Sequence, residues 1–310
     1  MPATPNVRGG APIGVLERRA GIVRGIRRFF DERGFVEVET AVKIPAPAPE
    51  EHIDCPVVLD GAVVQCAEPP RVSGGSGVSF LRASPELQMK KLLAAGMDRI
   101  YQLGPCFRDG ERGARHSPEF TMLEWYRRGA TYLVVKADLE SLVSELAGGS
   151  AAFDDLFVRD AYLEFAGWDP WAEWDQDRFD FDMATKVEPA LKAHGGCVFL
   201  VDYPPQAASL ARVSTSADGL QRAERWEFYW DGLELANCFT ELCDRDEQAR
   251  RFALARDARR AIGESEYPPD DVFLDSLPAI GSASGAALGV DRLVMALTGI
   301  KEISAVRAEI

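Results

Sequence analysis

Phe107–Arg127 reads FRDGERGARHSPEFTMLEWYR, and this stretch decides the fold because it predicts two strands around a loop rich in charged residues. A strand period of two over 120–127 places Phe120, Met122, Glu124 and Tyr126 on one face. An acid between apolar neighbours needs a partner, since an unpaired buried carboxylate costs several kcal/mol or takes up a proton. We therefore predict that Glu124 faces a cation, supplied either by a ligand or by an arginine of the protein itself.

Two further segments add groups that suit phosphates and metal ions. Gly285–Met295, GAALGVDRLVM, predicts a strand of small residues that leads into an apolar helix, with Arg292 at the junction. Small residues let a backbone approach a ligand, and arginine offers a rigid fork to phosphate oxygens. Glu227–Glu241, EFYWDGLELANCFTE, places acids and an asparagine in strand-like sequence around the turn signal Asp231-Gly232. Carboxylates beside a phosphate site indicate magnesium.

The composition narrows the class of protein. The 310 residues carry a net charge of −14 without a basic run, which argues against a dedicated nucleic-acid surface. The sequence has no apolar run that would span a bilayer, and residues 1–14 lack the core of a signal peptide, so we expect a cytoplasmic protein with no membrane partner. The cysteines form no CxxC pair, which indicates neither a zinc knuckle nor a disulfide framework. They are Cys55, Cys66, Cys106, Cys197, Cys238 and Cys243.

In this order, the three segments resemble the catalytic core of class II aminoacyl-tRNA synthetases of the lysyl type. The hairpin around Arg108 is similar to motif 2, and the segment around Arg292 is similar to motif 3. The resemblance is closer to a shortened paralogous family, the elongation factor P lysine ligases, with which the chain shares ASPELQMKKLLAAG, HSPEFTMLEWYR and ALGVDRLVM. It extends from about Leu16 to Val306 and implies an α/β (α+β) fold, in which helices flank an antiparallel sheet.

The resemblance also implies a domain organisation. We expect a single catalytic domain over 1–310, with a helical insertion at about 150–196. The first helical pattern starts near Val15, which leaves no room for the anticodon-binding barrel of lysyl-tRNA synthetases. The pattern of 16–33 predicts an amphipathic helix that stops at Gly34 and leads into a strand at Val36. In the family this helix and strand form motif 1 and the dimer interface, which implies a homodimer, although the helix could also pack only on its own sheet.

Family chemistry implies roles for the charged residues of the hairpin. ATP and an amino acid would give an aminoacyl adenylate and pyrophosphate, and an amine would then attack the activated carbonyl. Arg108 and Arg292 are the expected catalytic and phosphate-binding residues, and Phe120 would stack on adenine. Two further ATP contacts are His116, which could instead lie in water, and Glu111. The expected magnesium ligands are Glu227 and Glu234.

The remaining expected contacts form a pocket for a lysine-type amino acid. Its members are Ser84, Glu86, Glu124, Tyr126, Asn237, Phe239, Glu241 and Ala287. Glu86 would receive the amino group, and we favour this role because the family motif matches here residue by residue, although the capping of a helix by Ser84-Pro85-Glu86 could alone explain these residues. Asn237 would face the carboxylate, and Glu241 with Tyr126 the distal ammonium. Glu234 has the opposite strand parity from Asn237, so a bulge or twist must bring it to the metal.

The chain departs from the family at several of these places. Asp109-Gly110 delays the acid Glu111 by one residue, Ser117 replaces an asparagine, and Arg307 stands in an apolar stretch. Cys238 replaces a glycine and could narrow the pocket or fill space behind it. Ala287 stands where lysyl-tRNA synthetases have glycine and the shorter ligases have alanine, which favours (R)-β-lysine over α-lysine.

The resemblance therefore implies an ATP- and magnesium-dependent ligase that transfers a lysine-type amino acid to a lysine side chain of elongation factor P, without tRNA. Three alternatives stay open. The enzyme could activate another amino acid for a different protein, carrier or small-molecule acceptor. It could be a catalytically silent binding module, or it could charge a tRNA.

Overall fold

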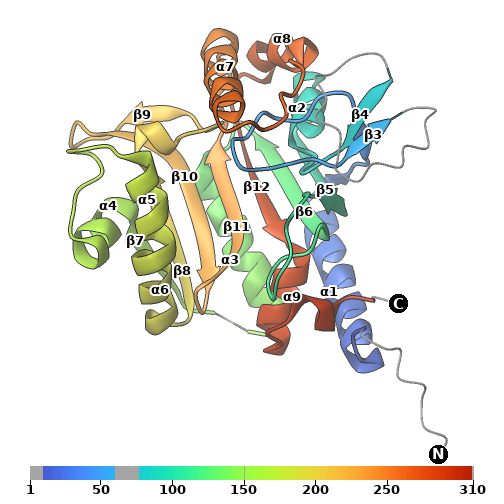
Figure 1. Ribbon diagram of the computed structural model, residues 1–310. Coiled ribbons are helices and arrows are strands. Elements are labelled where there is room, and N and C mark those ends of the chain that lie inside the picture. The colour runs from blue at the N-terminus through green and yellow to red at the C-terminus, as the bar shows by residue number, and fades with distance from the viewer. Residues whose placement is uncertain (1–9, 60–76, 150, 309–310) are drawn as a thin grey trace, which may run out of the picture.

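The computed structural model describes residues 10–59, 77–149 and 151–308, and its centre is a large sheet flanked by helices (Figure 1). The order of the strands along the sheet is β1-β5-β6-β12-β11-β10-β8-β7, with β9 paired to β10. Neighbours are antiparallel except for β1 with β5 and β7 with β8. The expected fold class is therefore confirmed. The strands are β1 (Val36–Glu37), β5 (Arg99–Phe107), β6 (Glu119–Arg128), β7 (Phe153–Phe157), β8 (Cys197–Tyr203), β9 (Val213–Thr215), β10 (Gln221–Trp230), β11 (Leu233–Thr240) and β12 (Ala283–Gly289).

A second, small sheet consists of β2 (Lys43–Ile44), β4 (Val78–Leu81) and β3 (Val57–Leu59), in that order. The longer helices are α1 (Ile13–Glu32), α2 (Glu86–Ala94), α3 (Tyr132–Ala147), α7 (Arg245–Ala261), α8 (Asp271–Ile280) and α9 (Val290–Thr298). None of the helices in the described ranges is both long and apolar enough to cross a membrane.

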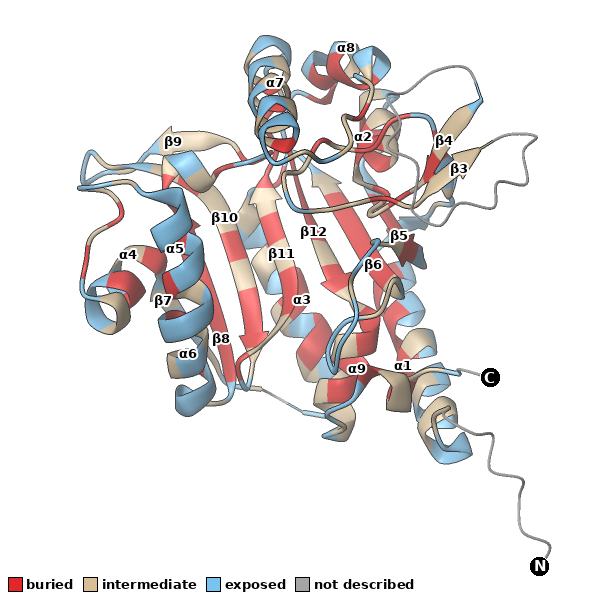
Figure 2. Ribbon diagram, in the orientation of Figure 1, coloured by how far each residue is buried: buried red, intermediate tan, exposed pale blue. Residues whose placement is uncertain are grey.

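One face of the large sheet is closed by α1, α3 and α9, which bury a common apolar core (Figure 2). Leu123 and Trp125 of β6 point into this core and are fully buried. The alternate residues of β6 therefore point to the opposite face, as the period of two predicts. This opposite face carries the candidate site.

The motif 1 region is confirmed in part. Helix α1 starts three residues earlier than expected, buries Ile22, Ile26 and Phe29, and stops before Gly34, whose φ of 72° favours glycine. The strand that follows is shorter than expected, because only Val36–Glu37 pairs with β5. Val36 is 52% exposed at this edge of the sheet.

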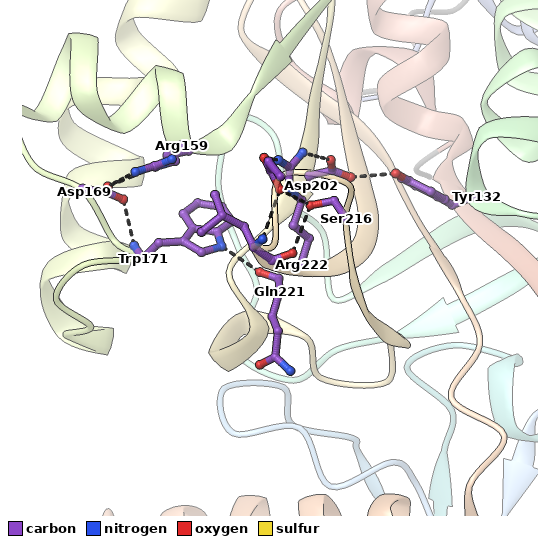
Figure 3. Close-up of polar contacts among 10 residues, drawn as sticks. Tyr132, Arg159, Asp169, Trp171, Asp202, Ser216, Gln221 and Arg222 are labelled. Carbon is purple, nitrogen blue, oxygen red and sulfur yellow. Dashed lines mark hydrogen bonds and ion pairs between the residues drawn. The ribbon is translucent and has the colours of Figure 1, made fainter.

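The segment 153–196 is only partly the expected helical insertion. It opens with a strand, β7, and continues with α4 (Val158–Ala161), α5 (Gln176–Asp182) and α6 (Glu188–His194). Polar contacts tie it to the end of β10 (Figure 3). Arg159 is ion-paired with Asp169 at 2.6 Å, and Nε1 of Trp171 donates to the carbonyl oxygen of Gln221 at 2.8 Å. The insertion thus contacts the sheet through the side chain of Trp171 as well as through the pairing of β7 with β8.

The turn between β10 and β11 has the predicted hairpin geometry. Asp231 and Gly232 have φ of 49° and 71°, as a two-residue hairpin turn requires. A Cβ on Gly232 would lie 2.7 Å from Cα of Lys192, so packing against α6 also demands glycine here.

The cysteines of the described residues are free, as expected, and Cys66 lies outside those residues. Cys238 is fully buried in the core beneath α3, with its Sγ 4.0 Å from the carbonyl oxygen of Tyr132. It therefore fills space behind the sheet and does not narrow the pocket.

Candidate functional site

A cavity of about 420 Å³ lies on the sheet face opposite α1, α3 and α9. Strand pairing builds its floor from two rows of residues that cross β10, β11, β12 and β6. The first row is Glu227, Asn237, Ala287 and Glu124, and the second is Arg225, Phe239, Gly285 and Tyr126. All eight line the cavity. The register therefore brings the three sequence segments into one site.

A bulge in β11 brings Glu234 into the same site. Phe228 pairs with Ala236, and the next residue, Tyr229, pairs with Glu234, so Leu235 has no partner on β10. The extra residue reverses the parity of β11, and both Glu234 and Asn237 line the cavity. The bulge predicted from the sequence is confirmed.

Arg108, His116 and Arg292, the side chains expected to bind phosphates, line the same cavity. Nη2 of Arg292 lies 2.8 Å from Nε2 of His116, and burial, followed by the charge of Arg292, lowers the pKa of His116. Nη1 of Arg108 reaches Oε1 of Glu111 at 3.4 Å, even though Glu111 comes one residue late. The Nε of Arg108 is buried without a hydrogen-bond partner in the described part of the chain. An unused guanidinium donor beside a cavity suits an anionic oxygen.

Phe120 joins this group, with its ring centroid 5.2 Å from the guanidinium carbon of Arg108. His116 is exposed, as one reading of the loop allowed, but its ring also contacts Arg292 and lines the cavity.

The two expected metal ligands, Glu227 and Glu234, both line the cavity. Burial, followed by the charge of Glu227, raises the pKa of Glu234. Glu227 accepts hydrogen bonds from Arg225 at 2.5 Å and from Tyr229 at 2.7 Å. No cluster of three or more metal-binding side chains occurs in residues 10–59, 77–149 and 151–308. Two carboxylates fit magnesium when phosphate oxygens and water complete its coordination.

The floor of the cavity holds a buried acid without a cation. Oε1 of Glu124 accepts a hydrogen bond from the hydroxyl of Tyr126 at 2.5 Å, and its Oε2 has no partner among the residues that the structure describes. Burial, followed by the charge of Glu86, raises the pKa of Glu124 to about 8. The alternative that an arginine of the protein pairs with Glu124 is therefore wrong for the described residues. The free oxygen points to a donor from a ligand.

A lysine that the sequence reading missed lies between two of the predicted acids. Nζ of Lys90 is 2.5 Å from Oε1 of Glu86 and is also ion-paired with Oε2 of Glu241. Glu241 does not line the cavity, and its Oε1 has no hydrogen-bond partner within residues 10–59, 77–149 and 151–308. Burial raises the pKa of Glu241 to about 8 despite the opposing charge of Lys90. The spacing of four residues between Glu86 and Lys90 on one helix was the signal that could have revealed this pair.

The start of α2 differs slightly from the prediction. The helix begins at Glu86 with Pro85 in the N-cap position, and the Oγ of Ser84 accepts from the backbone nitrogen of Glu86 at 3.1 Å. The helix thus starts one residue later than expected. Both Ser84 and Glu86 line the cavity.

Arg225 is the other residue that the sequence reading missed. Its Nε donates to Oδ1 of Asn237 at 3.0 Å, and its Nη2 donates to Glu227. One guanidinium therefore orients both the amide expected at the substrate carboxylate and an expected metal ligand. Its position two residues before Glu227 on the same strand face was the available signal.

Comparisons with known proteins agree on one family. The family model described as tRNA synthetases class II (D, K and N) matches residues 12–308. An elongation factor P–(R)-β-lysine ligase of Proteus mirabilis is 36% identical over 96% of this chain and 95% of the relative. Proteins of the same name from Yersinia enterocolitica and Sodalis glossinidius are 35% and 36% identical. The Yersinia alignment covers 99% of this chain and 98% of that relative, and the Sodalis alignment covers 92% and 91%.

Proposed function

The chain belongs to the class II tRNA synthetases (D, K and N), and from this premise we propose that it is an ATP-dependent ligase for a lysine-type amino acid. The amino acid is (R)-β-lysine, and the acceptor is a lysine side chain of elongation factor P. The names of relatives that align over nearly their whole length support both assignments.

One observation carries the amino acid class. Oε2 of Glu124 is buried in the floor of the cavity without a donor, beside the hydroxyl of Tyr126. A substrate ammonium would supply the missing donor, and a hydrogen bond to a charged group contributes about 1.5 to 3 kcal/mol. A neutral side chain would leave the carboxylate unpaired, so the site would reject it.

Ala287 favours the β isomer on steric grounds. Its position in the floor lies between Asn237, proposed at the carboxylate, and Glu124, proposed at the distal ammonium. The methyl group of Ala287 reduces the space for the carbon chain of the substrate, which joins its carboxylate to its distal ammonium. One methyl group biases a choice between isomers by about 1 to 3 kcal/mol.

Activation would begin when a carboxylate oxygen of the amino acid attacks the α-phosphorus of ATP and pyrophosphate leaves. Arg108 stabilises the charge that develops on the α-phosphate, and its unpartnered Nε is available for this contact. Arg292 and His116 hold the terminal phosphates, while Phe120 stacks on adenine. Glu227 and Glu234 would hold magnesium, which would supply positive charge against the phosphate oxygens.

Transfer follows when the neutral amine of the acceptor lysine attacks the activated carbonyl and AMP leaves. No side chain of the enzyme forms a covalent intermediate, so the residues act through positioning and electrostatics. Arg225 contributes by keeping Asn237 and Glu227 in place.

We also propose that the enzyme is a homodimer built on α1 and β1. The inner side of α1 packs on its own sheet, but Val36 is 52% exposed on the edge strand β1. An apolar side chain on an unpaired edge suits a second subunit. The chain otherwise forms one catalytic domain with the insertion at 153–196, and we expect it to act in the cytoplasm without tRNA.

An alternative is activation of another amino acid for another acceptor. Cys238 no longer supports it, because this side chain lies in the core behind the sheet. The altered loop at Asp109-Gly110 still supports this alternative. A silent binding module stays less favoured, because every predicted contact except Glu241 lines the cavity.

The test is the intact mass of elongation factor P after incubation with the enzyme, ATP, magnesium and either (R)-β-lysine or α-lysine. We expect a gain of one lysyl unit that is larger with the β isomer and absent with Arg108→Ala. Pyrophosphate exchange with a different amino acid, and no gain with either lysine, would overturn both the substrate and the acceptor.

A further inference from the structure

Lys90 of α2 is buried among the acids of the amino-acid pocket. Its side chain is 1% exposed and contacts Glu86 on its own helix and Glu241 just after β11. Its Nζ also lies 5.0 Å from the ring centroid of Phe239. Lys90 does not line the cavity, so it is a fixed part of the wall behind the substrate.

A purely structural role explains this arrangement poorly. Burying three charged groups costs desolvation energy, and apolar residues of similar volume are usually as stable or more so. Lys91, the next residue, shows what a structural helix lysine does here, because it pairs with Asp270 of the α8 N-cap at 2.6 Å. Lys90 instead joins Glu86, which lines the cavity, to Glu241, which lies buried in the wall behind it.

We propose that Lys90 is a positioning and specificity-determining residue that fixes the charge of the amino-acid pocket to match substrates with two ammonium groups. The proposal rests on the proposed function. Glu86, Glu124 and Glu241 supply three negative charges when ionised, and Lys90 offsets one of them. Two net negative charges remain, which equal the two ammonium groups of a diamino acid.

The geometry also separates the two ammonium sites. Lys90 occupies the space between Glu86 and Glu241, so neither acid can turn toward the other. Glu86 lines the cavity and can meet the ligand there, while Glu241 lies in the wall behind it, where its Oε1 has no partner in the described part of the chain. Without Lys90, one carboxylate would have to take up a proton to relieve the repulsion among the three.

The groups that face the two titrating acids define the expected pH behaviour. Glu241 faces Lys90 and Glu86, with Cys243 nearby, and Glu124 faces Glu86, Tyr126, Lys90 and Glu241. Lys90 is the cation in both sets, and its charge lowers the pKa of each acid. Its removal should therefore move the ionisation of both acids above pH 8.

The test compares Lys90→Met with Lys91→Met, a neighbouring lysine whose ion pair lies outside the pocket. Amino-acid-dependent pyrophosphate exchange gives KM and kcat for (R)-β-lysine and α-lysine from pH 6.5 to 9. We expect Lys90→Met to raise KM about tenfold at pH 7.5. The fall of KM with rising pH should occur about one pH unit higher than in the wild type, because a shift of one pKa unit changes the ionised fraction of an acid about tenfold. Lys91→Met should leave this profile unchanged, and Lys90→Arg should restore its midpoint because the charge is kept.

Two results would overturn the proposal. A wild-type KM and pH profile in Lys90→Met, with only a lower free energy of unfolding, would make Lys90 structural. A lower KM in Lys90→Met would show that Lys90 competes with the substrate for Glu241.

A separate readout distinguishes this proposal from the proposed function. If the wild type activates no diamino acid, the proposed function fails. The effect of the Lys90 charge on the acids is then measured by the free energy of unfolding without substrate. The difference in unfolding free energy between the wild type and Lys90→Met should widen above pH 8, because the folded variant resists ionisation of its acids. A difference that stays constant with pH would overturn the charge role, and Lys90→Gln takes the place of Lys90→Met if the latter does not fold.

Discussion

Gly285→Ala should damage the amino-acid pocket although it adds only one methyl group. A Cβ at Gly285 would lie 2.2 Å from Cδ1 and Cε1 of Tyr126 and 2.9 Å from its Cζ. These atoms belong to a rigid ring that is 2% exposed, so the ring must move by more than 1 Å to regain ordinary contact, as the overpacking of a filled site requires. The hydroxyl of Tyr126 would then leave Oε1 of Glu124, which it now reaches at 2.5 Å.

The expected magnitude has two parts. Overpacking a filled site costs about 1 to 3 kcal/mol of unfolding free energy. The lost hydrogen bond to a charged acceptor contributes about 1.5 to 3 kcal/mol, which corresponds to a rise in KM of about ten- to a hundredfold if it acts on substrate binding.

The assay combines urea unfolding with the KM for the amino acid in pyrophosphate exchange. Gly289→Ala, in the same strand, is the control for unfolding, because its added Cβ would lie 3.8 Å from its nearest neighbour, Cδ of Arg292, which is an ordinary contact. Tyr126→Phe removes the hydroxyl without the clash. If the clash has already broken the hydrogen bond, Tyr126→Phe should add little to KM in the Gly285→Ala background. A wild-type KM in Gly285→Ala would refute this reasoning. Fully additive effects of Gly285→Ala and Tyr126→Phe on KM in the double variant would also refute it.

Four further predictions concern acidic side chains of the protein. The pKa values of Glu124 and Glu241 are raised to about 8 in the fold, so the ligand-free protein should lose stability as pH rises from about 4.5 through 8. Binding of a diamino acid should release about one proton or more at pH 7, measured by calorimetry in buffers of different ionisation enthalpy, and proton uptake would contradict the assignment. Glu234→Gln should raise the magnesium concentration needed for half-maximal pyrophosphate exchange about tenfold or more, and an unchanged requirement would exclude Glu234 as a ligand. Asp291→Asn should lower the unfolding free energy by about 3 kcal/mol, because buried Asp291 pairs with Arg19 at 2.5 Å and accepts a hydrogen bond from the backbone nitrogen of Thr121 at 2.8 Å. A loss below about 1 kcal/mol in urea unfolding would show that the fold does not depend on this ion pair.

The sequence by itself determined the features that depend on short-range geometry. The period of two in β6 put Phe120, Glu124 and Tyr126 on one face, and the pair Asp231-Gly232 marked the turn. Strand parity, together with the metal role that the resemblance implies for Glu234, also required a bulge or twist between Glu234 and Asn237, and β11 has a bulge at Leu235. These predictions succeeded because backbone periodicity and turn angles are set by neighbouring residues.

Tertiary structure alone decided which charged groups meet. Lys90 lies near Glu241 only because α2 packs beside the end of β11, and Arg225 reaches Asn237 only through the register of β10 with β11. Glu124 was expected to face a cation, but only the packed fold shows that the described protein residues do not supply it. An ion pair between residues far apart in sequence depends on three-dimensional distance and burial, and a local pattern contains neither quantity.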